Sequence, residues 1–237
     1  MARVWRGIDA LFGVFGLIGS LLLIYVLLFA TFAAFEPGPA GEDAVGAAFT
    51  IGFEALFAAT VLVLATRRRA SLSDLGFRRP DRWGPLAIAV VGAYATLFGY
   101  GLLIGLLDQL GVDVGWFEGG NSIPLDEEAS DGLPRVALIA LFGVAVVLVA
   151  PIAEELFFRG LLFRSLDEAW PGWAAVVVSG VAFGAFHLNP AVILPFSVIG
   201  MLFAWAFRAS GSLWVTVAAH FIINALSFIV TIVEVAR

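Results

Sequence analysis

A small set of ionisable side chains lies inside otherwise apolar stretches of this sequence. The run VLVAPIAEELFFRGLLF contains Glu154, Glu155 and Arg159. The two histidines of the chain, His187 and His220, stand in similar runs. A charged side chain at the centre of a bilayer costs about 2.5–3.5 kcal/mol on insertion scales, so such groups need a partner or a function. Glutamate and histidine are also among the residues that transfer protons and bind zinc in enzymes.

Helical spacing separates the roles of the two glutamates. Glu155 and Arg159 are four residues apart with the acid first, which is the better order for an ion pair on one helix face. Glu154 is turned by about 100° from Glu155 around a helix of 3.6 residues per turn, so it does not share that face. We therefore assign Glu155 to Arg159 as a compensated pair, and we expect Glu154 to be the base that activates water.

The helices that carry Glu154 and His187 are predicted to lie side by side. The turn between them is expected at EAWPGW (168–173), because its proline and glycine break a helix. Each residue lies about sixteen positions from that turn, so in an antiparallel pair the two side chains reach a similar depth and can face each other. His220 and Asn224 are four residues apart and can present donors on one face, which makes them candidates for stabilising an oxyanion. Counted from the next turn, RASGS, His220 lies lower than His187.

Long apolar runs surround these residues and define the fold class. The chain of 237 residues is 61% hydrophobic and 14% charged, and about 20 apolar residues span a bilayer as a helix. The sequence therefore predicts an all-α fold, a polytopic membrane helix bundle with about seven transmembrane helices. The expected spans are 9–35, 44–66, 84–107, 136–163, 172–189, 193–208 and 212–233. The first run is too long for the core of a signal peptide and is predicted to be a retained span.

Two regions are distinguished within a single integral membrane domain. Residues 1–110 hold the N-terminal membrane helices, and residues 136–233 hold the helices that carry the polar motifs. Glu54, in the first region, is interpreted as a satisfied polar residue or as one close to an interface. The chain has no cysteine, which excludes disulfides, thiolate nucleophiles and sulfur-ligated metals.

Arginines in the loops indicate the orientation in the membrane. The loop at 67–83 holds six arginines, and two more precede the first span. The loop at 36–43 holds three acids and no base, and the loop at 108–135 holds seven acids and a single arginine. Because arginine-rich loops stay cytoplasmic, the N-terminus is predicted to be cytoplasmic and the acidic loops external. By the same argument we expect the substrate entrance at the cytoplasmic, arginine-rich end.

Three motifs occur in order on the apolar runs of the second region. They are EELFFR (154–159), FGAFH (183–187) and HFIIN (220–224). Together they resemble the CPBP family of intramembrane endopeptidases, which are related to the CAAX prenyl proteases and to bacteriocin self-immunity proteins. The family pattern is E-E-x-x-x-R, then F-x-x-x-H, then H-x-x-x-N/D on successive core helices. The resemblance covers about residues 136–233 and identifies them as CPBP-type catalytic core helices.

The resemblance implies an enzyme that cleaves peptide bonds inside or beside a prokaryotic cell membrane. Its substrates would be membrane-associated peptides or proteins, with the lipid bilayer as the other partner and no nucleic acid. A water molecule activated by glutamate would be the nucleophile, supported by histidine and asparagine. The catalytic residues of the family correspond to Glu154, Glu155, His187, His220 and Asn224, with Arg159 supporting them.

Two alternatives remain beside this hypothesis. In the first, zinc is the cofactor, because two histidines and one glutamate make a ligand set with an open position for water; the candidate ligands are His187 and His220, although H-E-x-x-H is absent. In the second, the protein is a non-catalytic polytopic membrane protein, such as a proton-coupled transporter, an immunity protein or a scaffold. Intramembrane acids and histidines also form proton relays.

Overall fold

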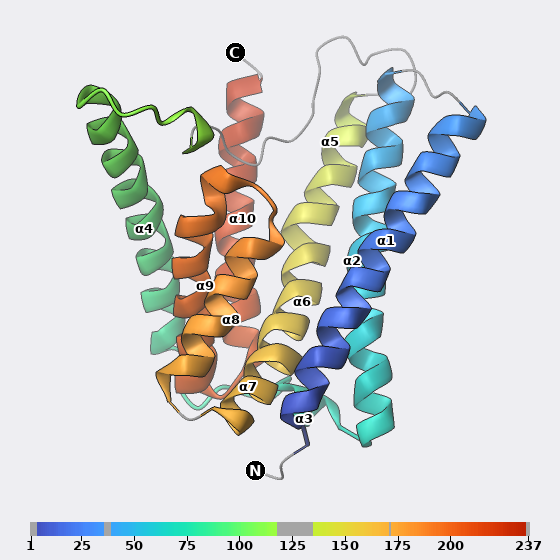
Figure 1. The fold of residues 1–237 in the computed structure, drawn as a ribbon, viewed down its shortest axis with the longest axis vertical. Coiled ribbons are helices and arrows are strands. Elements are labelled where there is room, and N and C mark those ends of the chain that lie inside the picture. The colour runs from blue at the N-terminus through green and yellow to red at the C-terminus, as the bar shows by residue number, and fades with distance from the viewer. Residues whose placement is uncertain (1–3, 36–38, 118–134, 171, 236–237) are drawn as a thin grey trace.

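The protein is a bundle of long helices. The computed structural model describes residues 4–35, 39–117, 135–170 and 172–235, and every regular element in these ranges is helical. The two ends of the chain lie at opposite ends of the bundle (Figure 1). The continuous long helices are α1 (Gly7–Phe35), α2 (Pro39–Arg68), α4 (Gly84–Gln109), α9 (Pro190–Ser210) and α10 (Leu213–Val235), joined by the shorter α8 (Trp173–Phe186), α3 (Leu72–Leu75) and η1 (Gly115–Phe117). The predicted all-α membrane bundle is confirmed.

The helix that carries the two glutamates is assembled from five consecutive segments. It runs from Arg135 to Ala169 as α5 (Arg135–Gly143), η2 (Val144–Val149), α6 (Ala150–Glu155), η3 (Leu156–Phe163) and α7 (Arg164–Ala169). The segments η2 and η3 are π-helical, and they flank α6 on both sides. Wider turns of this kind occur mostly at functional sites, because they rotate the side chains that follow. The helix also continues past residue 163, as the predicted position of the next turn requires.

Six helices among the described residues are long and apolar enough to cross a membrane, and α8 is shorter. The sequence predicts a full span at 172–189, but α8 has 14 residues, or about 21 Å at 1.5 Å per residue, against a hydrocarbon core of about 30 Å. Asn189 starts the next helix at once, because its side chain accepts a hydrogen bond from the Ala191 N–H at 3.0 Å. α8 is thus followed almost directly by α9, and His187 lies at the turn between them.

Glycines let α8 and α9 approach closely. A Cβ atom on Gly180 would lie 2.6 Å from the backbone nitrogen of Met201, and one on Gly184 would lie 2.4 Å from the carbonyl oxygen of Ile193. Both distances are too short for a side chain, so only glycine allows this contact. Small residues at helix crossings are the usual means of close packing in membranes, where apolar side chains gain nothing by leaving lipid.

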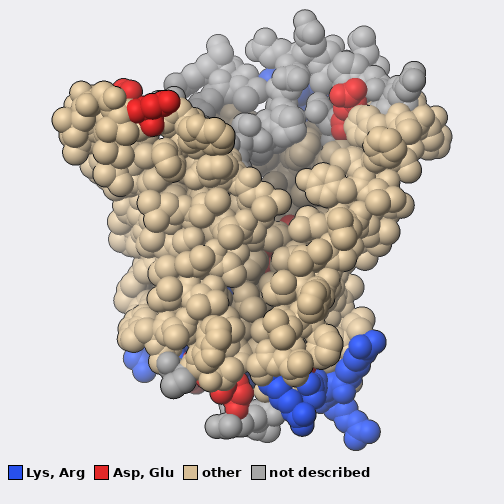
Figure 2. All heavy atoms as spheres, viewed as in Figure 1, with Lys and Arg blue, Asp and Glu red and all other residues tan. Residues whose placement is uncertain are grey.

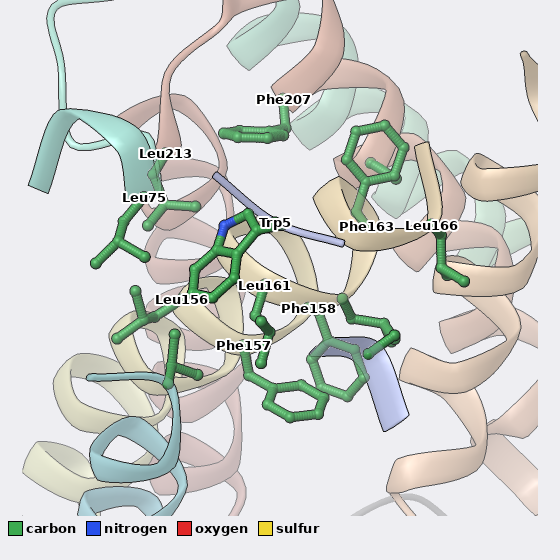
Figure 3. Close-up of a cluster of buried hydrophobic side chains, with 14 of the residues drawn as sticks. Trp5, Leu75, Leu156, Phe157, Phe158, Leu161, Phe163, Leu166, Phe207 and Leu213 are labelled. Carbon is green, nitrogen blue, oxygen red and sulfur yellow. The ribbon is translucent and has the colours of Figure 1, made fainter. Parts of the chain in front are cut away.

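One end of the bundle is filled by a hydrophobic cluster (Figure 3). The short α3 and the α9–α10 turn lie at this end, where the Leu213 N–H donates to the Gly76 carbonyl oxygen at 2.7 Å. The members labelled in Figure 3 come from the N-terminal segment, α3, η3, α7, α9 and α10: Trp5, Leu75, Leu156, Phe157, Phe158, Leu161, Phe163, Leu166, Phe207 and Leu213. This apolar packing closes the bundle below the polar residues.

Arginines gather at one end of the bundle, together with some acidic side chains that pair with them. Figure 2 shows arginines gathered at the end that holds α3 and the N-terminal end of the chain, and acidic side chains at both upper corners of the opposite end. Most of the predicted acidic loop, residues 118–134, lies outside the described residues. The predicted loop at 36–43 is partly helix, because α2 begins at Pro39.

Arg159 is a completely buried cation that ties three helices together. Its Nη1 donates to Glu155 Oε1 at 2.7 Å, which confirms the predicted ion pair. Its Nη2 donates to the carbonyl oxygen of Gly200 on α9 at 3.0 Å. The guanidinium also lies over the rings of Phe183 on α8 and Phe203 on α9, at 4.6 and 5.2 Å. Such contacts with aromatic faces add to the attraction when the cation is desolvated.

We expect Arg159→Ala to act mainly on folding. The change leaves the Glu155 carboxylate buried without a cation, and breaking a buried pair in this way costs about 3–5 kcal/mol. Unfolding of the detergent-solubilised protein, followed by helical circular dichroism, measures the loss. The matched control is Arg208→Ala, since Arg208 pairs with Asp167 at a partly exposed position and such pairs contribute less than about 1 kcal/mol. Equal stability of the two variants would refute the structural role of Arg159.

The predicted orientation can be measured because the chain has no native cysteine. Ser73 in α3 and Gln109 at the end of α4 are both exposed, lie at opposite ends of the bundle and carry no charge. With the arginine-rich end in the cytoplasm, Gln109→Cys should react with a membrane-impermeant maleimide on intact cells, and Ser73→Cys only after permeabilisation. The reverse pattern would invert the topology.

Candidate functional site

A cavity of about 640 Å³ lies between α2, the helix of α5 and α6, and the helices α8 to α10. Its wall is mostly apolar and aromatic, with Phe53, Phe142, Phe183, Phe186, Phe196, Phe203 and Phe228 among its members. Four of the predicted site residues line it: Glu154, His187, His220 and Asn224. An apolar cavity with a few convergent polar groups is the usual form of a ligand site.

Glu155 does not line the cavity but is buried behind the residues of its wall. Its Oε1 accepts from Arg159 at 2.7 Å and lies 3.1 Å from His220 Nδ1, and the carboxylate is completely buried. A carboxylate can only accept, so Nδ1 of His220 carries the proton and Nε2 is left for the cavity. The expected contact of a glutamate with a histidine is therefore made by Glu155 and His220. The facing pair predicted from equal depth, Glu154 and His187, shares the cavity wall without a hydrogen bond between them.

His187 is held by its own helix. Its Nδ1 lies 2.9 Å from the carbonyl oxygen of Phe183, one turn earlier, so this nitrogen is the donor and Nε2 is free. Its ring meets Phe183 and Phe196 edge-on, with centroids 5.1 and 4.5 Å apart. The ring of Phe183 also packs on His220 at 5.8 Å. Phe183, the first residue of the F-x-x-x-H motif, thus contacts both histidines.

The relative heights of the two histidines follow from contacts around the α9–α10 turn. His220 and Phe203 lie at similar distances from Gly211, on either side of that turn, and their rings are in contact at 5.6 Å. Phe203 in turn faces Phe183, which lies one helical turn below His187. His187 therefore lies about one turn above His220. Pro195 stands inside α9 and does not end it.

Asn224 is positioned by a backbone defect in η2. The Ala150 N–H bonds to the carbonyl oxygen of Ala145, five residues earlier, as in a π-helix. The next residue, Pro151, has no N–H, so in this register the carbonyl of Val146 lacks a backbone donor. The side-chain amide of Asn224 donates to that oxygen at 2.9 Å. Its second N–H remains for the cavity, and Pro151 is the sequence signal that could have indicated this contact.

Glu154 is the free carboxylate of the site. It is 6% exposed, lines the cavity, and makes no side-chain hydrogen bond with the residues that the structure describes. This agrees with the prediction that Glu154 is left without a partner while Glu155 is compensated. Its position in a low-dielectric cavity, beside two histidines and an amide, suits it to accept a proton from water.

Glu54 joins the site from α2, which the sequence analysis did not foresee. It was interpreted as satisfied or interfacial, but it is 5% exposed, lines the same cavity as Glu154, and its Oε2 is buried without a hydrogen-bond partner. An isolated glutamate in an apolar run is the only sequence signal for it. Which residues it faces depends on how α2 packs, and no local spacing encodes that.

The proposed zinc ligands do not form a metal site in this arrangement. Within the described ranges, no group of three or more histidine and acidic side chains is placed to hold one ion. The Nδ1 atoms of both histidines are engaged, with Phe183 and Glu155, which leaves Nε2 of each histidine for the cavity. Because no three such groups converge on one point in the described ranges, no step below is routed through a metal.

The cavity extends away from the arginine-rich end, contrary to the predicted entrance. On α10 its lining residues run from His220 to Thr231, and on α2 from Glu54 back to Thr50, in both cases towards the acidic end. Figure 2 shows a hollow between the α4 and α1 sides of the bundle, with acidic atoms at its depth. The hydrophobic cluster of Figure 3 fills the other end. The position of His220 near the start of α10 misled the sequence argument, because packing rather than depth decides where a cavity opens.

Comparisons with known proteins agree with this site. A family model described as "Type II CAAX prenyl endopeptidase Rce1-like" matches residues 136–226, which include Glu154, His187, His220 and Asn224. The chain is 25% identical over 175 residues to a protein of Bacillus subtilis (strain 168) named "Putative membrane peptidase YdiL", which covers 73% of this chain and 67% of that protein. No solved structure matches significantly. The helices that build the polar cavity are thus similar to those of the Rce1-like CAAX prenyl endopeptidases over residues 136–226.

Proposed function

We propose that this protein is an intramembrane endopeptidase that hydrolyses peptide bonds of membrane-associated peptides or proteins, with water activated by Glu154. One observation carries the proposal: among the described residues Glu154 has no hydrogen-bond partner in the cavity, while the adjacent Glu155 is neutralised by Arg159. The free carboxylate is the group that can change its protonation during a reaction.

In this scheme Glu154 takes a proton from water, and the oxygen attacks the carbonyl carbon of the scissile bond. The C–N bond of the tetrahedral intermediate then breaks, and Glu154 returns the proton to the leaving amine. His187 offers the lone pair of Nε2 to the water, since its Nδ1–H is given to the Phe183 carbonyl. No covalent intermediate with the protein is needed.

The oxyanion is stabilised by Asn224 and His220. Asn224 has one amide N–H beyond the one it gives to Val146. In this scheme His220 donates to the oxyanion from a proton on Nε2, while Glu155 accepts from its Nδ1. Glu155 then acts as a positioning residue through His220, with Arg159 as its permanent counterion.

Hydrolysis is favoured over a proton relay by the closed end of the bundle. A relay needs polar groups that continue to both faces of the membrane. Below the site the packed side chains of Phe157, Leu161, Phe163 and their neighbours are apolar (Figure 3). On α2 and α10 the residues that line the cavity extend away from this layer. Together with a cytoplasmic arginine-rich end in a prokaryotic cell membrane, this gives substrates access from the external half of the bilayer.

We expect Glu154→Gln to abolish cleavage without loss of the fold. The amide has the same shape and still forms hydrogen bonds, but it cannot take a proton, and removal of a general base lowers rates by about 10²–10⁴-fold. Mass spectrometry of peptides released from host membranes by the purified wild type and variant measures the effect. Ser197→Ala, a change on α9 outside the cavity wall, is the control. Full cleavage by Glu154→Gln would move the base to another residue.

The same assay separates the metal-free scheme from the zinc alternative. We expect strong chelators to leave cleavage unchanged and the purified protein to contain no stoichiometric zinc by plasma mass spectrometry. Activity that disappears on chelation and returns with added zinc would contradict this. In that case bound zinc should also be lost in His187→Ala and His220→Ala, which would assign both residues as ligands.

A further inference from the structure

Glu54 is a third carboxyl group in the cavity, and no part of the proposed reaction uses it. It comes from α2, outside the 136–226 region that matches the family and outside all three motifs. Its side chain is buried, Oε2 has no partner, and it lines the wall that Glu154 also lines. The two carboxyl groups therefore face the same cavity from different helices.

Aromatic packing fixes the position of Glu54. Phe53 stacks on Phe186 of α8 with ring centroids 5.9 Å apart. Phe57, one helical turn on, stacks on Phe186 at 5.3 Å and meets Phe157 of η3 at 4.3 Å. These contacts hold α2 against the two helices that carry His187 and Glu154. Glu54 therefore has a defined place in the site, unlike a polar residue that could turn away into lipid.

No arginine or lysine is among the described residues that line the cavity with Glu54. Glu155 is matched by Arg159, which lies outside the cavity wall. The other titratable groups of the wall are Glu154, His220 and His187, and the Nδ1–H of His187 is already given to Phe183. Among the described residues, α4, α5 and α9 add no titratable side chain to its wall. A charge on Glu54 would thus be buried without a partner, which is far more costly than keeping the proton.

We propose that Glu54 is a positioning residue of this site, an un-ionised carboxyl that donates a hydrogen bond to Glu154, directly or through one water molecule, and holds that carboxylate in its reactive orientation. The inference rests on the proposed function, because it concerns the residue assigned as base. A carboxylic acid beside a carboxylate gives a strong, charge-assisted hydrogen bond without adding charge. It would also keep the free Glu154 from turning towards a histidine.

The test compares two substitutions of Glu54 in the full-length protein reconstituted in lipid nanodiscs. Glu54→Gln keeps a hydrogen-bond donor and cannot ionise, whereas Glu54→Leu keeps the size and removes the donor. The probe is an internally quenched peptide that the wild type cleaves, chosen from a peptide library. We expect Gln to retain kcat within about threefold and Leu to lower kcat about 10–100-fold, the effect of one hydrogen bond to a charged group. KM should change by less than about twofold in both, since the substrate is not contacted.

Three results would overturn the inference. Wild-type kcat in Glu54→Leu would show that the donor is not needed. Loss of activity in Glu54→Gln as complete as in Glu154→Gln would show that Glu54 must ionise. A change in KM alone would place Glu54 on the substrate. If the Leu variant does not fold, Glu54→Met replaces it, because Met is also apolar and of similar length.

Glu154→Gln, measured in parallel, separates this inference from the proposed function. If Glu154→Gln loses cleavage but Glu54→Leu cleaves like the wild type, the role of Glu54 is rejected and the proposed function stands. Equal cleavage by wild type and Glu154→Gln rejects the proposed base and the inference that depends on it. Thermal unfolding of each variant distinguishes a purely structural role, which would lower stability and leave kcat of the folded protein unchanged.

Discussion

The structure depends on the burial of one carboxylate, that of Glu155. An ionised group at this depth is tolerated only with close compensation, and Glu155 Oε1 has both the Arg159 guanidinium and the His220 imidazole as donors. Because these donors lie on η3 and α10, and Arg159 also reaches the Gly200 carbonyl, the carboxylate connects three helices at a single point. The remaining polar groups of the site take their places around this contact. Its removal would leave charges in an apolar interior, which is why it constrains the fold more than any single apolar contact.

Backbone irregularity supplies the rest of the positioning. The π-helical segments on both sides of α6 shift the register of the side chains, and the proline at the start of α6 leaves a carbonyl that needs a donor. Asn224 provides that donor from another helix, so the same side chain repairs the backbone and reaches the cavity. In a membrane an unsatisfied carbonyl is costly, because no bulk water is present to bond it. A local defect therefore becomes a specific contact between two helices.

The shape of the cavity follows from the short α8. α8 ends at Phe186 and α9 begins four residues later, so the turn between them borders the cavity, which His187 lines. Aromatic rings from α2, α8 and α9 form the walls. Below, the hydrophobic cluster completes the packing and separates the site from the arginine-rich end (Figure 3).

The sequence by itself determined the helical membrane fold, six of the seven spans, the Glu155–Arg159 pair and the free Glu154. Each of these follows from local information: apolar runs of sufficient length, or residues four apart on one helix face. Only the tertiary structure decided that His220 rather than His187 meets a glutamate, that α8 is too short to cross, that the cavity opens away from the arginines, and that Glu54 belongs to the site. These features depend on how separate helices are rotated and staggered against one another, through glycine contacts, π-turns and aromatic stacking. Spacing along one helix holds no information about the helix that packs against it.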